Sequence, residues 1–251
     1  MLNNKNFIVV SWVVAMLFSG MFSLEAQTQE NAALAILKDS RDRYDKYVED
    51  YTATFYKTQR INNAIKNEVI EIKFMKPFCV YFKFLKPDAG KEVIYVEGKN
   101  NNKLIGHLGG AISLIPISRW LSPTDPMAMA GNKYPITRTG IGNMLDSLIS
   151  QYDLAQANGD LEAYYMGVEI LDGRPTHVIV RRLPPSKDYA CYFSVTNIDI
   201  ETKLPIRNVS LDENFELLEM YYYSSIKVNV GLTEKDFDPN NSAYKFGFFK
   251  L

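Results

Sequence analysis

The strongest constraint on the fold is a two-residue alternation of side chains that recurs in short segments from residue 51 onwards. Residues 51–56 alternate in this way. Side chains of a β-strand point alternately to opposite faces of its sheet, so this period is typical of strands. Turn-forming pairs such as Asn62-Asn63 and Asp172-Gly173 separate the segments. The sequence therefore predicts short antiparallel strands joined by tight turns.

Two groups of strands are expected, one on each side of a central irregular segment. They begin with segments around Phe55 and Ile72 and continue at 78–85, 93–97, 103–107, 161–171, 175–183, 189–200, 204–211 and 215–230. The tail, 232–251, is expected to add an edge strand or a strap. Open sheets of ten or eleven strands tend to curl. The predicted fold class is therefore mostly β (α+β), a curved antiparallel sheet forming a half-barrel.

Two amphipathic helices are predicted, over 28–49 and 141–157, because apolar residues recur there at helical spacing. We expect both helices to lie over the concave side of the sheet. Gly140 and Gly142 at the start of the second helix favour close approach of the helix to the sheet. An anion site at this helix N-terminus is the weaker alternative.

The central segment, 108–139, contains several Gly and Pro residues among apolar ones. Long connections within compact domains are often lids or binding loops. We therefore expect this segment to take part in binding.

Residues 1–26 have the layout of a secretory signal peptide, with Lys5 before an apolar run at 7–22 and small or polar residues after it. The run is shorter than the roughly 18 residues expected of a spanning helix. Cleavage after Ala26 would leave 27–251 as a single domain without a transmembrane segment. The expected location is the periplasm, in solution or peripheral to the outer membrane.

Several function classes lack support in the sequence. A formal net charge of −1, spread along the chain, argues against nucleic-acid binding. Only His107 and His177 are present, neither in a metal-ligand motif, so no catalytic residue, cofactor or metal site is predicted. We expect His107 in a surface loop and His177 packed within a strand. Cys79 and Cys191 fall on opposite strand parities, which favours two buried thiols over a disulfide.

The positive signal is an excess of apolar and aromatic side chains. Aromatic residues make up 13% of the chain, and Tyr81 lies on the strand side opposite Phe82. A sheet that is apolar on both faces must have both faces covered, and a ligand or partner can supply part of one cover. The candidate residues for an apolar binding site are Phe82, Phe84, Trp120, Leu121, Met127, Met129, Met144 and Leu148.

Five stretches carry a resemblance to a known family: residues 77–81, 90–98, 126–136, 199–206 and 229–237. Together they resemble an uncharacterised family of exported bacterial proteins, known as a domain of unknown function. That family is related in fold to the LolA/LolB lipoprotein carriers, whose half-barrels enclose an acyl-chain cavity under helices. The resemblance implies a LolA-like half-barrel over 27–251.

Three hypotheses of function follow. The leading one is a periplasmic carrier that binds a lipid, an acyl chain or a lipoprotein-like ligand. The second is a non-enzymatic interaction module with a self-filled core and an envelope protein as partner. The third, an enzyme acting on envelope lipids or glycans, would require Asp125, Lys133, Tyr134 and Arg138 to converge in one cleft.

Overall fold

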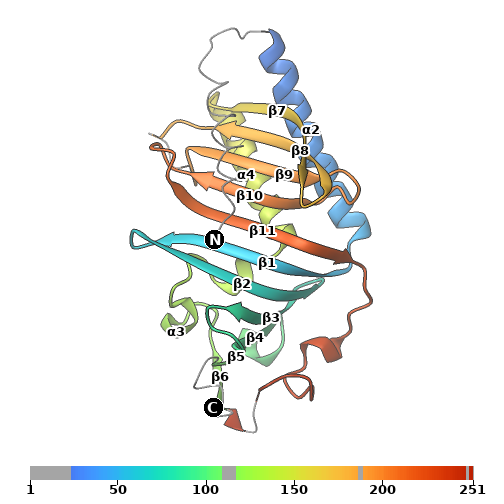
Figure 1. Cartoon of the computed structure of the whole chain (residues 1–251), viewed down its shortest axis with the longest axis vertical. Helices are drawn as coiled ribbons and strands as arrows, with labels where there is room; N and C mark the ends of the chain where they lie inside the picture. The colour runs from blue at the N-terminus through green and yellow to red at the C-terminus, as the bar shows by residue number, and fades with distance from the viewer. Residues whose placement is uncertain (1–23, 109–116, 186–188, 247–248, 251) are drawn as a thin grey trace.

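Twelve strands form one sheet in the computed structural model, which describes residues 24–108, 117–185, 189–246 and 249–250 (Figure 1). Most of the predicted signal peptide, residues 1–23, lies outside the described residues. The first six strands are β1 (Asp50–Ile61), β2 (Ala64–Met75), β3 (Cys79–Lys86), β4 (Glu92–Val96), β5 (Leu104–His107) and β6 (Ile117–Leu121). The others are β7 (Glu162–Leu171), β8 (Arg174–Arg182), β9 (Phe193–Asp199), β10 (Pro205–Leu211), β11 (Leu217–Val228) and β12 (Phe249–Lys250).

Strand β1 joins the two halves of the sheet. The strand order is β12-β6-β5-β4-β3-β2-β1-β11-β10-β9-β8-β7. Each half is a meander of sequence neighbours, as tight turns dictate, and β1 pairs with β2 on one side and β11 on the other. All pairs of described strands are antiparallel except β12 with β6. The predicted curved antiparallel sheet is confirmed, and β6 adds a strand within the segment expected to be irregular.

Two long helices, α2 (Leu24–Tyr47) and α4 (Ile141–Asn158), pack over the β7–β9 part of the concave face. Leu37 from α2 and Leu148 from α4 meet Ile179 of β8 in one buried cluster. We call the elements that lie over the concave face the cover. Besides the two long helices, the cover includes α3 (Pro126–Met129) and the 3₁₀ turn η3 (Ile136–Arg138). In Figure 1, α4 lies behind the sheet. The predicted placement of the helices is therefore confirmed.

The start of α4 approaches its neighbours closely because two glycines precede and begin it. A Cβ on Gly140, whose φ is +102°, would lie 2.9 Å from Cε2 of Phe74, and one on Gly142 would lie 2.7 Å from Cε1 of Tyr44. Contacts this short exclude a side chain. The expectation that these glycines serve close packing is confirmed.

The C-terminal segment covers the outer face at the β3–β6 end. Phe237 of η4 (Glu234–Phe237) and Phe246 pack with Tyr81 and Ile105. The buried Asp50 carboxylate accepts hydrogen bonds from the amides of 230–232, which fixes where this segment leaves the sheet. The tail thus acts as both the predicted strap and, through β12, an edge strand.

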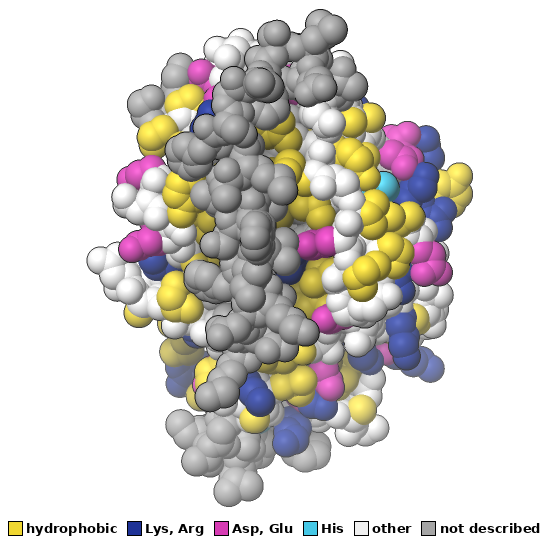
Figure 2. Space-filling view, turned by 45° about the horizontal axis from the view of Figure 1, so that its top comes forward, with side chains coloured by type: hydrophobic (Ala, Val, Ile, Leu, Met, Phe, Trp, Pro, Cys, Tyr) yellow, Lys and Arg dark blue, Asp and Glu magenta, His cyan; other side chains and the backbone are white. Residues whose placement is uncertain are grey.

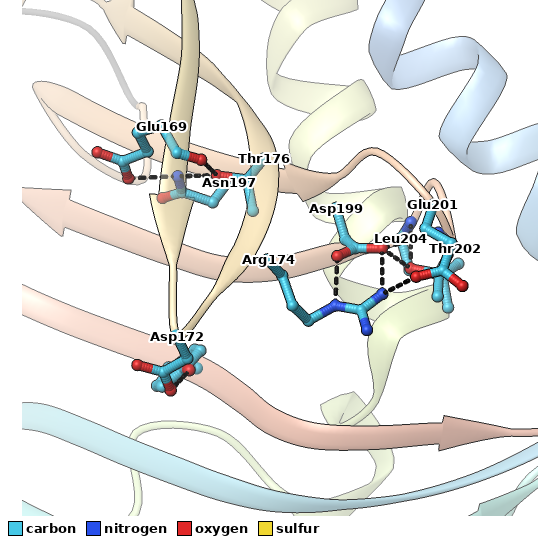
Figure 3. Close-up of polar contacts among 10 residues, drawn as sticks. Glu169, Asp172, Arg174, Thr176, Asn197, Asp199, Glu201, Thr202 and Leu204 are labelled. Atoms are coloured by element: carbon cyan, nitrogen blue, oxygen red, sulfur yellow. Dashed lines mark hydrogen bonds and ion pairs between the residues drawn. The ribbon is translucent and has the colours of Figure 1, made fainter.

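A polar network stabilises the β7–β10 end of the sheet (Figure 3). Asn197 donates to Glu169 and Thr176, at 2.6 and 3.0 Å. Asp199 accepts from both Nε and Nη2 of Arg174, at 2.5 and 2.7 Å, which is a bidentate pair. These contacts link strands β7, β8 and β9 on the face of the sheet opposite the two long helices.

Candidate functional site

A cavity of about 670 Å³ lies between the concave face of the sheet and the cover formed by α4 and the segment before it. This volume is within the range of roughly 300–1,000 Å³ typical of small-molecule sites. Apolar wall residues come from four strands of one half of the sheet: Phe55, Phe82, Phe84, Val93 and Leu104. Leu108, Met127 and Arg138 line the cavity and are exposed, so the cavity is open to solvent.

The structure brings six of the eight candidate apolar residues together on the cavity wall. These are Phe82, Phe84, Leu121, Met127, Met144 and Leu148. Trp120 lies instead on the outer face, packed against the cluster that contains Ile105. Its neighbours Arg119 and Leu121 line the cavity, and alternation along β6 turns Trp120 the other way. Met129, at the end of α3, is not among the lining residues.

The segment predicted to be a binding loop is fastened over the sheet by polar contacts. Lys57 of β1 donates to Oδ1 of Asn132 at 2.5 Å. The amide of Lys133 donates to Oε1 of Gln59 at 3.1 Å, and the Lys133 ammonium pairs with Glu219 of β11 at 3.0 Å. Three sheet residues therefore anchor this part of the cover beside the cavity.

Basic side chains outnumber acidic ones on the cavity wall. Among the described lining residues the charged set is Lys57, Lys91, Arg119, Arg138, Arg181 and a single carboxylate, Glu219. The outer surface has no such bias in the view of Figure 2, where acidic, basic and hydrophobic side chains are interspersed. The cavity is thus more cationic than the net charge of −1 suggests.

Two wall lysines have altered pKa values because they are buried. Burial lowers the pKa of Lys57, although Glu68 at 2.6 Å acts against this effect. Burial also lowers the pKa of Lys91, whose Nζ lies 4.5 Å from the centroid of the Phe84 ring. Lys91 is therefore a basic group in largely apolar surroundings.

Arg181 is one of several wall residues that were not predicted from the sequence. It lies on the buried strand β8, and it is 3% exposed. The alternation along the strand could have indicated its position. Arg181 lies on the same side of β8 as Ile179, which faces the helices, so its side chain also points to the interior. Cys191 also lines the cavity, whereas Cys79 lies on the outer face, and both are free thiols.

Of the four residues named for an enzyme, Tyr134 and Arg138 line the cavity, whereas Asp125 and Lys133 are not among its lining residues. The Asp125 carboxylate accepts from the amide of Met127 and caps α3, and Lys133 pairs with Glu219. His177 contacts the Tyr165 hydroxyl through Nδ1 at 3.0 Å, as expected of a packing histidine. The expectation for His107 was wrong, because it is 1% exposed at the end of β5, where it lines the cavity and neither ring nitrogen has a hydrogen-bond partner among the described residues. Within the described part of the chain, no cluster of potential metal ligands is found.

A curved antiparallel sheet with helices over a cavity is the architecture that these residues form. The chain belongs to the DUF1571 family, described as "Protein of unknown function (DUF1571)", whose model matches residues 48–246. The predicted membership of a family of unknown function is thereby confirmed. No curated protein matches the sequence significantly.

Several solved structures resemble the fold at low sequence identity. The lipoprotein LppX from Mycobacterium tuberculosis matches with a TM-score of 0.48 and 15% identity, over 83% of this chain and 99% of that one. An uncharacterized conserved protein from Thermus thermophilus matches with a TM-score of 0.47 and 15% identity, over 80% and 91%. The LolA superfamily protein NE2245 from Nitrosomonas europaea matches with a TM-score of 0.32 and 10% identity, over 82% and 97%. Among the helices in the described residues, none has the length and hydropathy to cross a membrane.

Proposed function

We propose that this protein binds and carries a lipid, an acyl chain or a lipoprotein-like apolar ligand in the bacterial envelope, after export and removal of residues 1–26. The observation that supports the proposal is the open cavity of about 670 Å³ with Phe82, Phe84 and Leu121 on its wall. A self-filled interaction module would leave no cavity of this volume. An enzyme is less well supported, because Asp125 and Lys133 are not on the wall and the one carboxylate among the described wall residues, Glu219, is paired with Lys133.

The apolar wall supplies enough free energy for useful binding. Each buried methylene contributes about 0.8 kcal/mol. Burial of about ten methylenes against the wall therefore contributes roughly 8 kcal/mol, which is the free energy of a micromolar Kd. A long acyl chain meets this requirement even when part of it remains outside.

The test is native mass spectrometry, with lipid extraction, on protein purified from the envelope of its own host. We expect a co-purifying apolar molecule that is lost in Met144→Glu, because Met144 lines the cavity. Met129→Glu is the matched control, since Met129 is partly buried on the same cover but does not line the cavity. A wild-type protein without bound lipid that also fails to take up lipid from vesicles would refute the proposal.

A further inference from the structure

Arg181 is a buried guanidinium without an acidic partner among the described residues. Its Nε and Nη1 atoms have no hydrogen-bond acceptor there, and Nη2 makes only a 3.4 Å contact with Sγ of Cys191. The ring centroid of Tyr152 lies 5.3 Å from Cζ of Arg181. The guanidinium thus lies on the cavity wall, and its Nε and Nη1 donors are unpaired among the described residues.

A second buried arginine in the same half of the sheet, Arg207, has hydrogen-bond acceptors within the protein and serves as a comparison. Arg207 is 7% exposed, and its Nη2 pairs with Glu169 at 2.6 Å while its Nε donates to Asn197 at 2.8 Å. Removing a charge from water is costly unless it is paired and hydrogen-bonded. Arg207 meets this condition from within the described protein and Arg181 does not. Because Arg181 lies on the cavity wall, a ligand in the cavity can supply the acceptor that the described residues do not.

The cavity wall is divided along the sheet. Strands β3, β4 and β5 contribute the apolar side chains Phe82, Phe84, Val93 and Leu104 together with His107, whereas β8 and β10 contribute only the polar residues Arg181, Asn208 and Ser210. In the strand order, β8 lies six positions from β3. With about 4.8 Å between neighbouring strands, the two parts of the wall are well separated along the curved sheet. A ligand that fills this cavity needs a polar end and an apolar end.

We propose that the ligand is an anionic amphiphile whose carboxylate or phosphate head binds Arg181 and whose chain extends along Phe82 and Phe84. This inference rests on the proposed function and adds the chemical class and orientation of the ligand. The planar guanidinium suits both head groups because it donates parallel hydrogen bonds to paired oxygen atoms. Lys91, on the wall beside Phe84, adds positive potential.

The experiment measures binding to delipidated protein by calorimetry, using palmitate, hexadecyl phosphate and the neutral hexadecanol, which share one chain length. Wild-type protein should bind the two anions about ten- to a hundredfold more tightly than the alcohol, as charge-assisted hydrogen bonds imply. Arg181→Met should abolish this preference while hexadecanol still binds. Arg119→Met, which removes an exposed cation of the same wall, is the control and should retain most of the preference.

Each outcome has a distinct meaning. Equal binding of all three probes by the wild type, or an unchanged preference in Arg181→Met, would overturn the assignment of Arg181 and leave the carrier function standing. Inorganic phosphate binding as tightly as hexadecyl phosphate would replace the amphiphile with a free anion. If none of the three probes bound, the carrier function itself would fail.

Thermal unfolding of the delipidated protein separates ligand binding from a structural role. Because Arg181→Met removes an unpaired buried charge, its Tm should equal or exceed that of the wild type. A lower Tm together with weaker binding of all three probes would assign Arg181 to structure and overturn the proposal.

Discussion

Adjacent residues of α4 should respond differently to truncation, because one belongs to the core and the other to the cavity wall. Leu145 is 0% exposed within the main core cluster, whereas Met144 is only partly buried and lines the cavity. Leu145→Ala removes packed methylenes and leaves a void, so we expect it to lower the free energy of unfolding by roughly 2–5 kcal/mol. For a domain of this size the Tm should fall by about 4–20 °C.

Met144→Ala should cost less, about 1 kcal/mol or below, because part of its side chain already borders empty space. Urea unfolding followed by circular dichroism measures both variants, with the m-value checking that the same surface is exposed. Met144→Ala should instead weaken binding of a long-chain ligand. Equal destabilisation by the two substitutions would show that the wall is packed like the core and would refute this account of the cavity.

Three further predictions concern the scaffold that shapes the cavity. Gly142→Ala places a Cβ against the Tyr44 ring and should destabilise the protein by about 1–3 kcal/mol in urea unfolding; a neutral effect would contradict the close approach of α4. Asp50→Ala leaves the amides of 230–232 without their acceptor and should cost about 1–3 kcal/mol, with faster hydrogen exchange at these amides; unchanged exchange would contradict the strap. Asp199 is buried, which raises its pKa, but hydrogen bonds from its partners outweigh burial and hold the pKa below its ordinary value. Its contribution is therefore present above about pH 3.9 and lost as the pH falls further, so Asp199→Asn should reduce the acid sensitivity of chemical unfolding; an unchanged pH profile would argue against the ion pair.

Alternation and turn residues were sufficient to predict most of the sheet. The strand predicted at 175–183 is Arg174–Arg182, and the one predicted at 204–211 is Pro205–Leu211. Strand β6 was missed because it is short and lies among Gly and Pro residues, which obscure a period of two. The second long helix, predicted at 141–157, matches α4 because its apolar stripe and terminal glycine are both explicit in the sequence.

The cavity was harder to predict than the elements that form it. Local patterns assign side chains to strand faces, but the volume between sheet and cover depends on curvature and on contacts between distant residues. Trp120 was assigned to the site for its apolar character, although Leu121 and Trp120 cannot face the same side of one strand. Arg181 was passed over because a single charged residue in a strand usually faces solvent.

A crystal structure of the protein purified from its host envelope without delipidation tests the central claim most directly. The account predicts continuous density for an elongated ligand in the cavity, with its polar end at Arg181 and its chain beside Phe82 and Phe84. A cavity filled by the protein's own side chains, or ligand density only on another surface, would contradict it.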